Sequence, residues 1–338
     1  MPRSAGASDS AETGHEASID TRLWQRKASR GIEKIPSVHG KSSVSVYTLR
    51  RLGPTSKVPA IANDASGGYS MSITVPVRVV QRPFGGTARR DTWWLQPLVV
   101  FLGLTTFLVY SGWAAFQGNH YTFDPYLSPF YSPEIFGDSP HSWFGPKPAA
   151  WPAWLPFSPA LIILPIPGLF RLTCYYYRGA YYKAFWADPP ACSVGEPRSS
   201  YRGEHSFPLV VQNGHRYALF LALAVLFVLI FDVWKALWFT DPATGTVSFG
   251  IGVGTLVLAT NAVLLTLYLF GCHTLRHLAG GVFDQLSGRP IMRRTYSCVS
   301  CLNRRHMLWA WCSLCSVGFS DLYVRLCSMG VWSDLRVF

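Results

Sequence analysis

Residues 249–270 read FGIGVGTLVLATNAVLLTLYLF, and residues 271–277, GCHTLRH, follow them directly. The first stretch carries no charge over about the twenty residues that a helix needs to cross a lipid bilayer. The second stretch lies where that helix would leave the bilayer, and it places His273 and His277 four residues apart. On a continuous helix these imidazoles share one face, so they can chelate a metal ion or flank a redox ligand. Histidines at a membrane border also bind lipid headgroups, so the pair alone does not establish a metal site.

The rest of the chain has the composition of a membrane protein. Of its 338 residues, 49% are hydrophobic and only 14% are charged, against about a quarter in soluble domains. Apolar runs long enough to cross a bilayer occupy residues 95–116, 153–177, 217–239, 249–270 and 307–330. The second run contains four prolines, which we expect to shorten or kink its first half. We predict an all-α integral membrane protein with five transmembrane helices; counts of four or six fit less well.

The first seventy residues differ from the rest. They are rich in Ser, Gly, Ala, Lys and Arg and have no sustained apolar period, so we expect residues 1–70 to be a disordered extension. They also lack the apolar segment of a cleavable signal peptide. Met71 opens the segment that leads into the membrane part and is a second candidate start of the protein. We therefore expect a five-helix membrane part over residues 71–338.

The positive charge is distributed as the positive-inside rule requires. The net charge is +12, which could indicate nucleic acid, but the Lys and Arg residues gather in alternate loops between the apolar runs. Arg89 and Arg90 precede the first run, and residues 178–216 and 276–305 form the two basic loops. We therefore expect no nucleic-acid partner. The N-terminus and both basic loops should face the cytoplasm, and residues 117–152 the outer side.

This topology brings thiols and imidazoles to one membrane face. Ionisable groups at membrane depth are costly and are candidates for function. The residues expected at the cytoplasmic face are Cys174, Cys192, His215, Cys272, His273, His277 and His306. Two CxxC strings, Cys298–Cys301 and Cys312–Cys315, also have the spacing of a zinc or redox pair. The second string lies inside the last apolar run, where cysteine commonly behaves as a small apolar residue.

Several strings resemble one family, the cytochrome b-like membrane anchor of actinobacterial-type succinate dehydrogenase, respiratory complex II. They are YLSPFYSP (126–133), TCYYYRGAYYK (173–183), DPPAC (188–192), HRY (215–217), CHTLRH (272–277), LNRRHM (302–307) and DLYVR (321–325). The resemblance implies an anchor in the bacterial plasma membrane that docks the flavoprotein and iron–sulfur subunits on the cytoplasmic side. It also implies electron transfer to menaquinone or ubiquinone in the respiratory chain, while succinate oxidation, a step of the tricarboxylic acid cycle, belongs to other subunits. A higher oligomer of the complex is compatible with the resemblance.

The resemblance further implies a Rieske-type [2Fe–2S] cluster at the cytoplasmic face, with two Cys on one iron and two His on the other. We expect the ligands Cys174, Cys192, His273 and His277, with Cys272 and His215 as alternatives. Haem b between two histidines of the same face is the alternative cofactor. Two haems are not expected, because the outer half offers only His120 and His141, both in a loop.

Quinone should bind close to that cofactor. Tyr and Trp can hydrogen-bond a quinone carbonyl, and a neighbouring cation stabilises the developing negative charge. The candidates at this depth are Tyr177, Arg178, Trp186, Arg216, Arg276 and His306, although a border rich in Tyr and Arg is also an ordinary interfacial belt. A multi-span transporter would explain the helices but not the one-sided thiols and imidazoles, and no inverted repeat is visible.

Overall fold

The computed structural model describes residues 85–191, 193–195, 205–207, 209–241 and 243–338, together with two strands at residues 56–60 and 73–77. The chain divides into two units, Met1–Val80 and Gln81–Phe338.

In the first unit, strand β1 (Ser56–Ala60) pairs antiparallel with β2 (Ile73–Val77), so that Ser56 faces Val77 and Ala60 faces Ile73. Strand β1 lies within residues 1–70, and the disordered extension expected there stays a prediction. The alternating Ile and Val residues of β2 have the period of two that favours a strand. Met71 and the remaining residues of 1–70 lie outside the described part of the chain.

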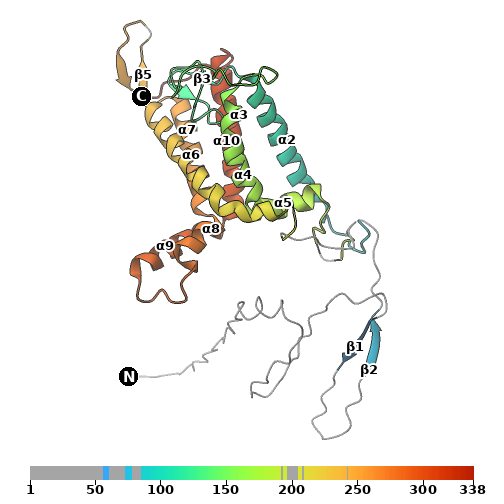
Figure 1. Cartoon of the computed structure of the whole chain (residues 1–338). Coiled ribbons are helices and arrows are strands. Elements are labelled where there is room, and N and C mark those ends of the chain that lie inside the picture. Colours follow the sequence, from blue (N-terminus) through green and yellow to red (C-terminus); the bar gives the residue numbers. More distant parts are fainter. Residues whose placement is uncertain are drawn as a thin grey trace, which may run out of the picture. The chain divides into compact units, whose positions relative to one another are not determined.

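The second unit is a helical bundle. Four of its helices are long and apolar enough to cross a membrane: α2 (Leu95–Gln117), α6 (His215–Lys235), α7 (Val253–Phe270) and α10 (His306–Ser328). They stand side by side in Figure 1. The count becomes five if one bent pair of helices is a single span. The prediction of an all-α membrane protein is confirmed, and four of the predicted spans match these helices to within a few residues.

The bent pair replaces the predicted span 153–177. Helices α3 (Pro159–Ile163) and α4 (Pro165–Thr173) form the first part of this pair. Helix α5 (Tyr175–Phe185) forms the second part and is bent by 82° relative to the first. Pro159 and Pro165 each begin a helix, where the missing N–H costs little. The prediction was therefore wrong at both ends, since the helix starts at Pro159 and breaks at Cys174. Beyond the break, α5 runs across the end of the bundle (Figure 1).

The two ends of the bundle differ. One end, here called the basic end, carries α5, the 3-10 helix η1 (Leu209–Gly214), α8 (His273–Arg276), the π-helix η2 (His277–Gly281) and α9 (Pro290–Asn303) (Figure 1). The other end, the loop end, carries the hairpins β3 (Thr122–Phe123) with β4 (Tyr126–Leu127) and β5 (Trp238–Thr240) with β6 (Val247–Phe249). Helix α9 was not predicted, because its arginine-rich sequence reads as a loop.

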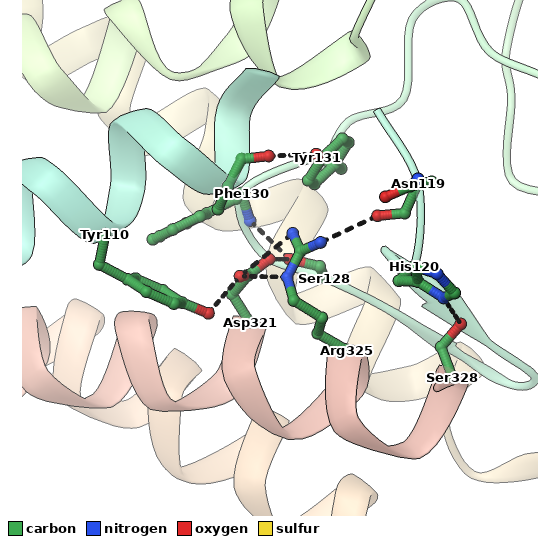
Figure 2. Close-up of polar contacts among 10 residues, drawn as sticks. Tyr110, Asn119, His120, Ser128, Phe130, Tyr131, Asp321, Arg325 and Ser328 are labelled. Atoms are coloured by element: carbon green, nitrogen blue, oxygen red, sulfur yellow. Dashed lines mark hydrogen bonds and ion pairs between the residues drawn. The ribbon is translucent and has the colours of Figure 1, made fainter. Parts of the chain in front are cut away.

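A buried ion pair fixes the loop end (Figure 2). Asp321 and Arg325 lie one turn apart on α10, and their side chains are 0% and 3% exposed. The Tyr110 hydroxyl of α2 donates to Asp321 Oδ2 at 2.6 Å, and the Ser128 hydroxyl donates to the other carboxylate oxygen. Arg325 donates to the Asn119 carbonyl at 3.0 Å. The pair thereby holds the loop after α2 against α10.

An aromatic core fills the basic end. Its buried members include Phe170 of α4 and Tyr177 of α5. They pack with Leu219 of α6, Tyr268 of α7 and Ala310 of α10, which are also buried. The five helices that supply this core also carry, at or next to their ends, Cys174, His215, Cys272 and His306.

Candidate metal centre and cavity

Two thiol–imidazole pairs lie at the basic end. Cys174 Sγ is 3.4 Å from His306 Nε2, and Cys272 Sγ is 3.1 Å from His215 Nε2. Both cysteines and His215 are buried, and His306 is half-buried. Each residue comes from a different helix end, so the pairs form only when the whole bundle is assembled.

Breaks between helices aim the two thiols at this point. Cys174 separates α4 from α5 with φ −60° and ψ 131°, and Cys272 separates α7 from α8 with φ −65° and ψ 139°. Gly271, which ends α7, is packed so closely that an added Cβ would lie 2.8 Å from the Leu267 carbonyl oxygen and 3.4 Å from His306 Nδ1. A glycine is therefore needed for the chain to bring Cys272 beside His215.

The surroundings of His215 fix its tautomer. The Thr173 hydroxyl donates to the Leu169 carbonyl at 2.8 Å, so Thr173 Oγ1 is left to accept from His215 Nδ1, also at 2.8 Å. The proton then sits on Nδ1, and the lone pair of Nε2 points toward Cys272. This is the arrangement of a metal-binding histidine, whose other nitrogen is held by a hydrogen bond. The Phe170 ring stacks on the imidazole at 4.6 Å.

Two buried polar atoms at His306 and its neighbour Tyr268 have no hydrogen-bond partner among the described residues. They are Nδ1 of His306 and the hydroxyl oxygen of Tyr268. The two rings stack at 5.0 Å, and the Cys174 thiol lies beside Tyr268. Buried polar atoms are nearly always satisfied, so each exception needs an explanation. A bound group is one that fits, because two thiols and two imidazoles already face this place.

Three of the four expected ligands, Cys174, His273 and His277, line one cavity at the basic end. His273 and His277 lie one helical turn apart, at the start of α8 and of η2, where the His277 N–H donates to the His273 carbonyl, and both residues are exposed. Cys192 lies outside the described residues. The pairs instead contain the alternatives Cys272 and His215, along with Cys174 and His306. Within the described part, no three His, Cys, Asp or Glu side chains gather around a point that could hold one metal ion.

The CxxC strings are separate from the pairs. Cys298 and Cys301 are exposed on α9, and Cys312 and Cys315 lie on the membrane helix α10.

Burial raises the pKa of the Cys272 thiol, a member of one thiol–imidazole pair, to about 11. Without a metal ion or a nearby cation, that thiol would stay protonated and unreactive.

A cavity of about 880 Å³ opens beside both pairs. All four thiol and imidazole side chains line it, as do His273 and His277. Three of the predicted quinone-binding residues, Arg178, Arg216 and His306, also line it. Arg304, which was not among those predicted, adds another cation to the lining. The cavity is therefore bordered by positive charge as well as by the metal-ligand types.

The other three quinone candidates have different contacts. The Tyr177 hydroxyl is buried and donates to the Ala310 carbonyl at 2.8 Å. Arg276 donates to the hydroxyls of Ser300 and Tyr296, and so ties α8 to α9. Trp186 packs against Tyr181 and Tyr182, with ring centroids 5.4 and 5.7 Å apart. None of these three lines the cavity.

Comparison with known proteins agrees with this architecture. Residues 95–330 match the family of the actinobacterial succinate dehydrogenase subunit SdhC. Among solved structures, a chain of the Mycobacterium smegmatis Sdh1 complex in the apo form is 40% identical, with a TM-score of 0.69. The match covers 77% of this chain and 96% of that chain. Comparison with curated proteins gave no match. The chain belongs to the family of the actinobacterial succinate dehydrogenase subunit SdhC and is a multi-pass membrane subunit of that complex.

Proposed function

We propose that this subunit passes electrons from an iron–sulfur subunit to quinone through a Rieske-type [2Fe–2S] centre at the basic end. The observation that carries the proposal is the pair of thiol–imidazole contacts, Cys174 with His306 and Cys272 with His215. Two thiolates and two imidazoles are the donor set of such a centre, which takes up and releases one electron when bound.

These four side chains revise the expected ligand set. Cys174 is kept, Cys272 and His215 replace Cys192 and His273, and His306 replaces His277. The protonated Nδ1 of His215 supports the choice, because it leaves Nε2 free to bind a metal ion. The buried Nδ1 of His306 then needs a partner that the described residues do not supply, such as a group of the docked subunit or a water molecule.

The cavity beside the pairs is the proposed quinone site. Its border holds Arg178, Arg216 and Arg304, whose positive charge would stabilise the negative charge that develops on a quinone oxygen. Tyr177 and Arg276, being engaged elsewhere, would support the walls of the site and not contact the quinone.

The basic end is also the proposed docking face. Positive charge gathers there on α5, α8 and α9, which by the positive-inside rule supports a cytoplasmic position for this end in a bacterial cell. The iron–sulfur subunit, with the flavoprotein subunit behind it, would dock at this face, next to the ligands that accept its electrons.

The test compares two cysteines in the purified complex. Cys272→Ser should lose most of the iron and acid-labile sulfide assigned to this subunit, whereas the matched variant Cys298→Ser should keep it. Succinate oxidation with a soluble electron acceptor should survive in both variants, and quinone reduction should fail only in Cys272→Ser. An unchanged iron and sulfide content in Cys272→Ser would contradict the proposed ligand set. A reduced haem absorption band would favour haem b instead.

A further inference from the structure

Arg171 is a cation at membrane depth that has neutral partners. It lies on α4, one turn before Cys174. Its Nη1 donates to the Tyr177 hydroxyl at 2.8 Å and to the Ala310 carbonyl at 3.3 Å, and its Nη2 donates to Ser313 Oγ at 3.0 Å. Every one of these acceptors is uncharged.

No carboxylate compensates this charge within the described residues. The ion pairs among the described residues include Arg89 with Asp91 and Arg325 with Asp321, and neither involves Arg171. A guanidinium group cannot give up its proton in a protein. A charged side chain in a membrane segment is costly and usually has an opposite charge or a function nearby. The question is therefore which negative charge Arg171 faces.

Contacts lead from Arg171 to the thiol–imidazole pairs. Its guanidinium carbon lies 4.7 Å from the centre of the Tyr268 ring, a cation–π distance. That ring stacks on His306 at 5.0 Å, and the Cys174 thiol lies beside Tyr268. One aromatic ring thus separates the guanidinium from a proposed imidazole ligand.

We propose that Arg171 supplies the counter-charge of the metal centre. It is a positioning residue, acting through Tyr268 without binding the metal. The inference rests on the proposed function, because it takes Cys174 and Cys272 as thiolate ligands of a two-iron centre that carries a net negative charge in its reduced form.

The positive charge of Arg171 should change the midpoint potential of the metal centre in one direction. Transfer of one electron from the docked iron–sulfur subunit to this site reduces one iron ion and adds one negative charge. The same electron then leaves to quinone, so the site returns to its oxidised state. A fixed positive charge nearby favours the reduced form. Arg171 therefore raises the midpoint potential and makes electron entry more favourable.

The test is a redox titration of the EPR signal in the intact complex. Arg171→Gln should lower the midpoint potential by about 59 mV, which is a tenfold change in the equilibrium constant of a one-electron couple. Arg171→Lys, which keeps the charge, should stay close to the wild type. Ser313→Asp should lower the potential too, because it places a carboxylate beside the guanidinium and leaves Arg171 in place. If the complex with Arg171→Gln does not assemble, Ser313→Asp is the variant that tests the inference.

The control removes a positive charge far from the site. Lys235→Gln lies at the other end of α6 from His215, about 30 Å away at the rise of an α-helix. It should leave the potential unchanged. If Arg171→Gln or Ser313→Asp keeps the wild-type potential, Arg171 merely ties α4 to α10 and the inference is overturned. A wild-type complex without the centre would overturn the proposed function and this inference together.

Discussion

Asp321 and Arg325 show how single residues hold the loop end together. Their buried pair, with the Tyr110 and Ser128 hydroxyls, leaves neither charge without a partner (Figure 2). Removing one member of such a pair leaves the other charge buried without a partner, which lowers the stability of the fold by about 3–5 kcal/mol.

We therefore expect Asp321→Ala to lower the free energy of unfolding by about 3–5 kcal/mol, because Arg325 stays buried without its carboxylate. Denaturant unfolding of the purified protein in detergent measures this change. The double variant Asp321→Asn with Arg325→Met removes both charges and should be less destabilised than the single variant. Equal stability of Asp321→Ala and the wild type would show that the pair contributes nothing.

The residues of the candidate site were only partly predictable. Cys174, His215, Cys272 and His306 were all placed at one membrane face, because each stands at the end of an apolar run. Which imidazole faces which thiol depends on the rotation of four helices, and hydrophobic length carries no such information. His306 was for that reason assigned to quinone and not to the metal.

The helices themselves differ in how well the sequence specifies them. Uninterrupted apolar runs of bilayer length predicted α2, α6, α7 and α10, because length and apolar composition suffice for a membrane helix. The breaks at Cys174 and at Gly271–Cys272 were missed. Both breaks are stabilised by packing around the thiols, which a local pattern cannot reveal. The pairing of His273 with His277 stays a prediction, since the two residues remain one helical turn apart on α8 and η2.

The α7–α8 junction gives a test at the level of one element. Gly271→Ala should displace the junction, because the new Cβ would lie 2.8 Å from the Leu267 carbonyl oxygen. Cys272 would then move away from His215, and we expect the iron content of the purified complex to fall several-fold. Gly112→Ala is the matched control, since its Cβ would meet nothing within 4 Å. Equal iron content in the two variants would show that the junction does not position Cys272.

The proposed orientation of the membrane part rests on its charge distribution. If the basic end faces the cytoplasm, the exposed Cys298 of α9 should be protected from an impermeant thiol reagent applied to intact cells. A cysteine introduced at the exposed position Ala149, in the loop before α3, should be labelled. Labelling of Cys298 in intact cells, without labelling at position 149, would invert the proposed topology and move the docking face to the outer side.

The central claim is that two thiols and two imidazoles at the basic end hold a Rieske-type centre. Low-temperature EPR of the succinate-reduced complex tests it most directly, with the variant His215→Ala/His306→Ala beside His273→Ala/His277→Ala. We expect a rhombic Rieske-type signal in the wild type that persists without His273 and His277 and disappears without His215 and His306. Loss of the signal only in His273→Ala/His277→Ala, or a wild type that lacks the signal and shows a haem absorption band, would contradict the account.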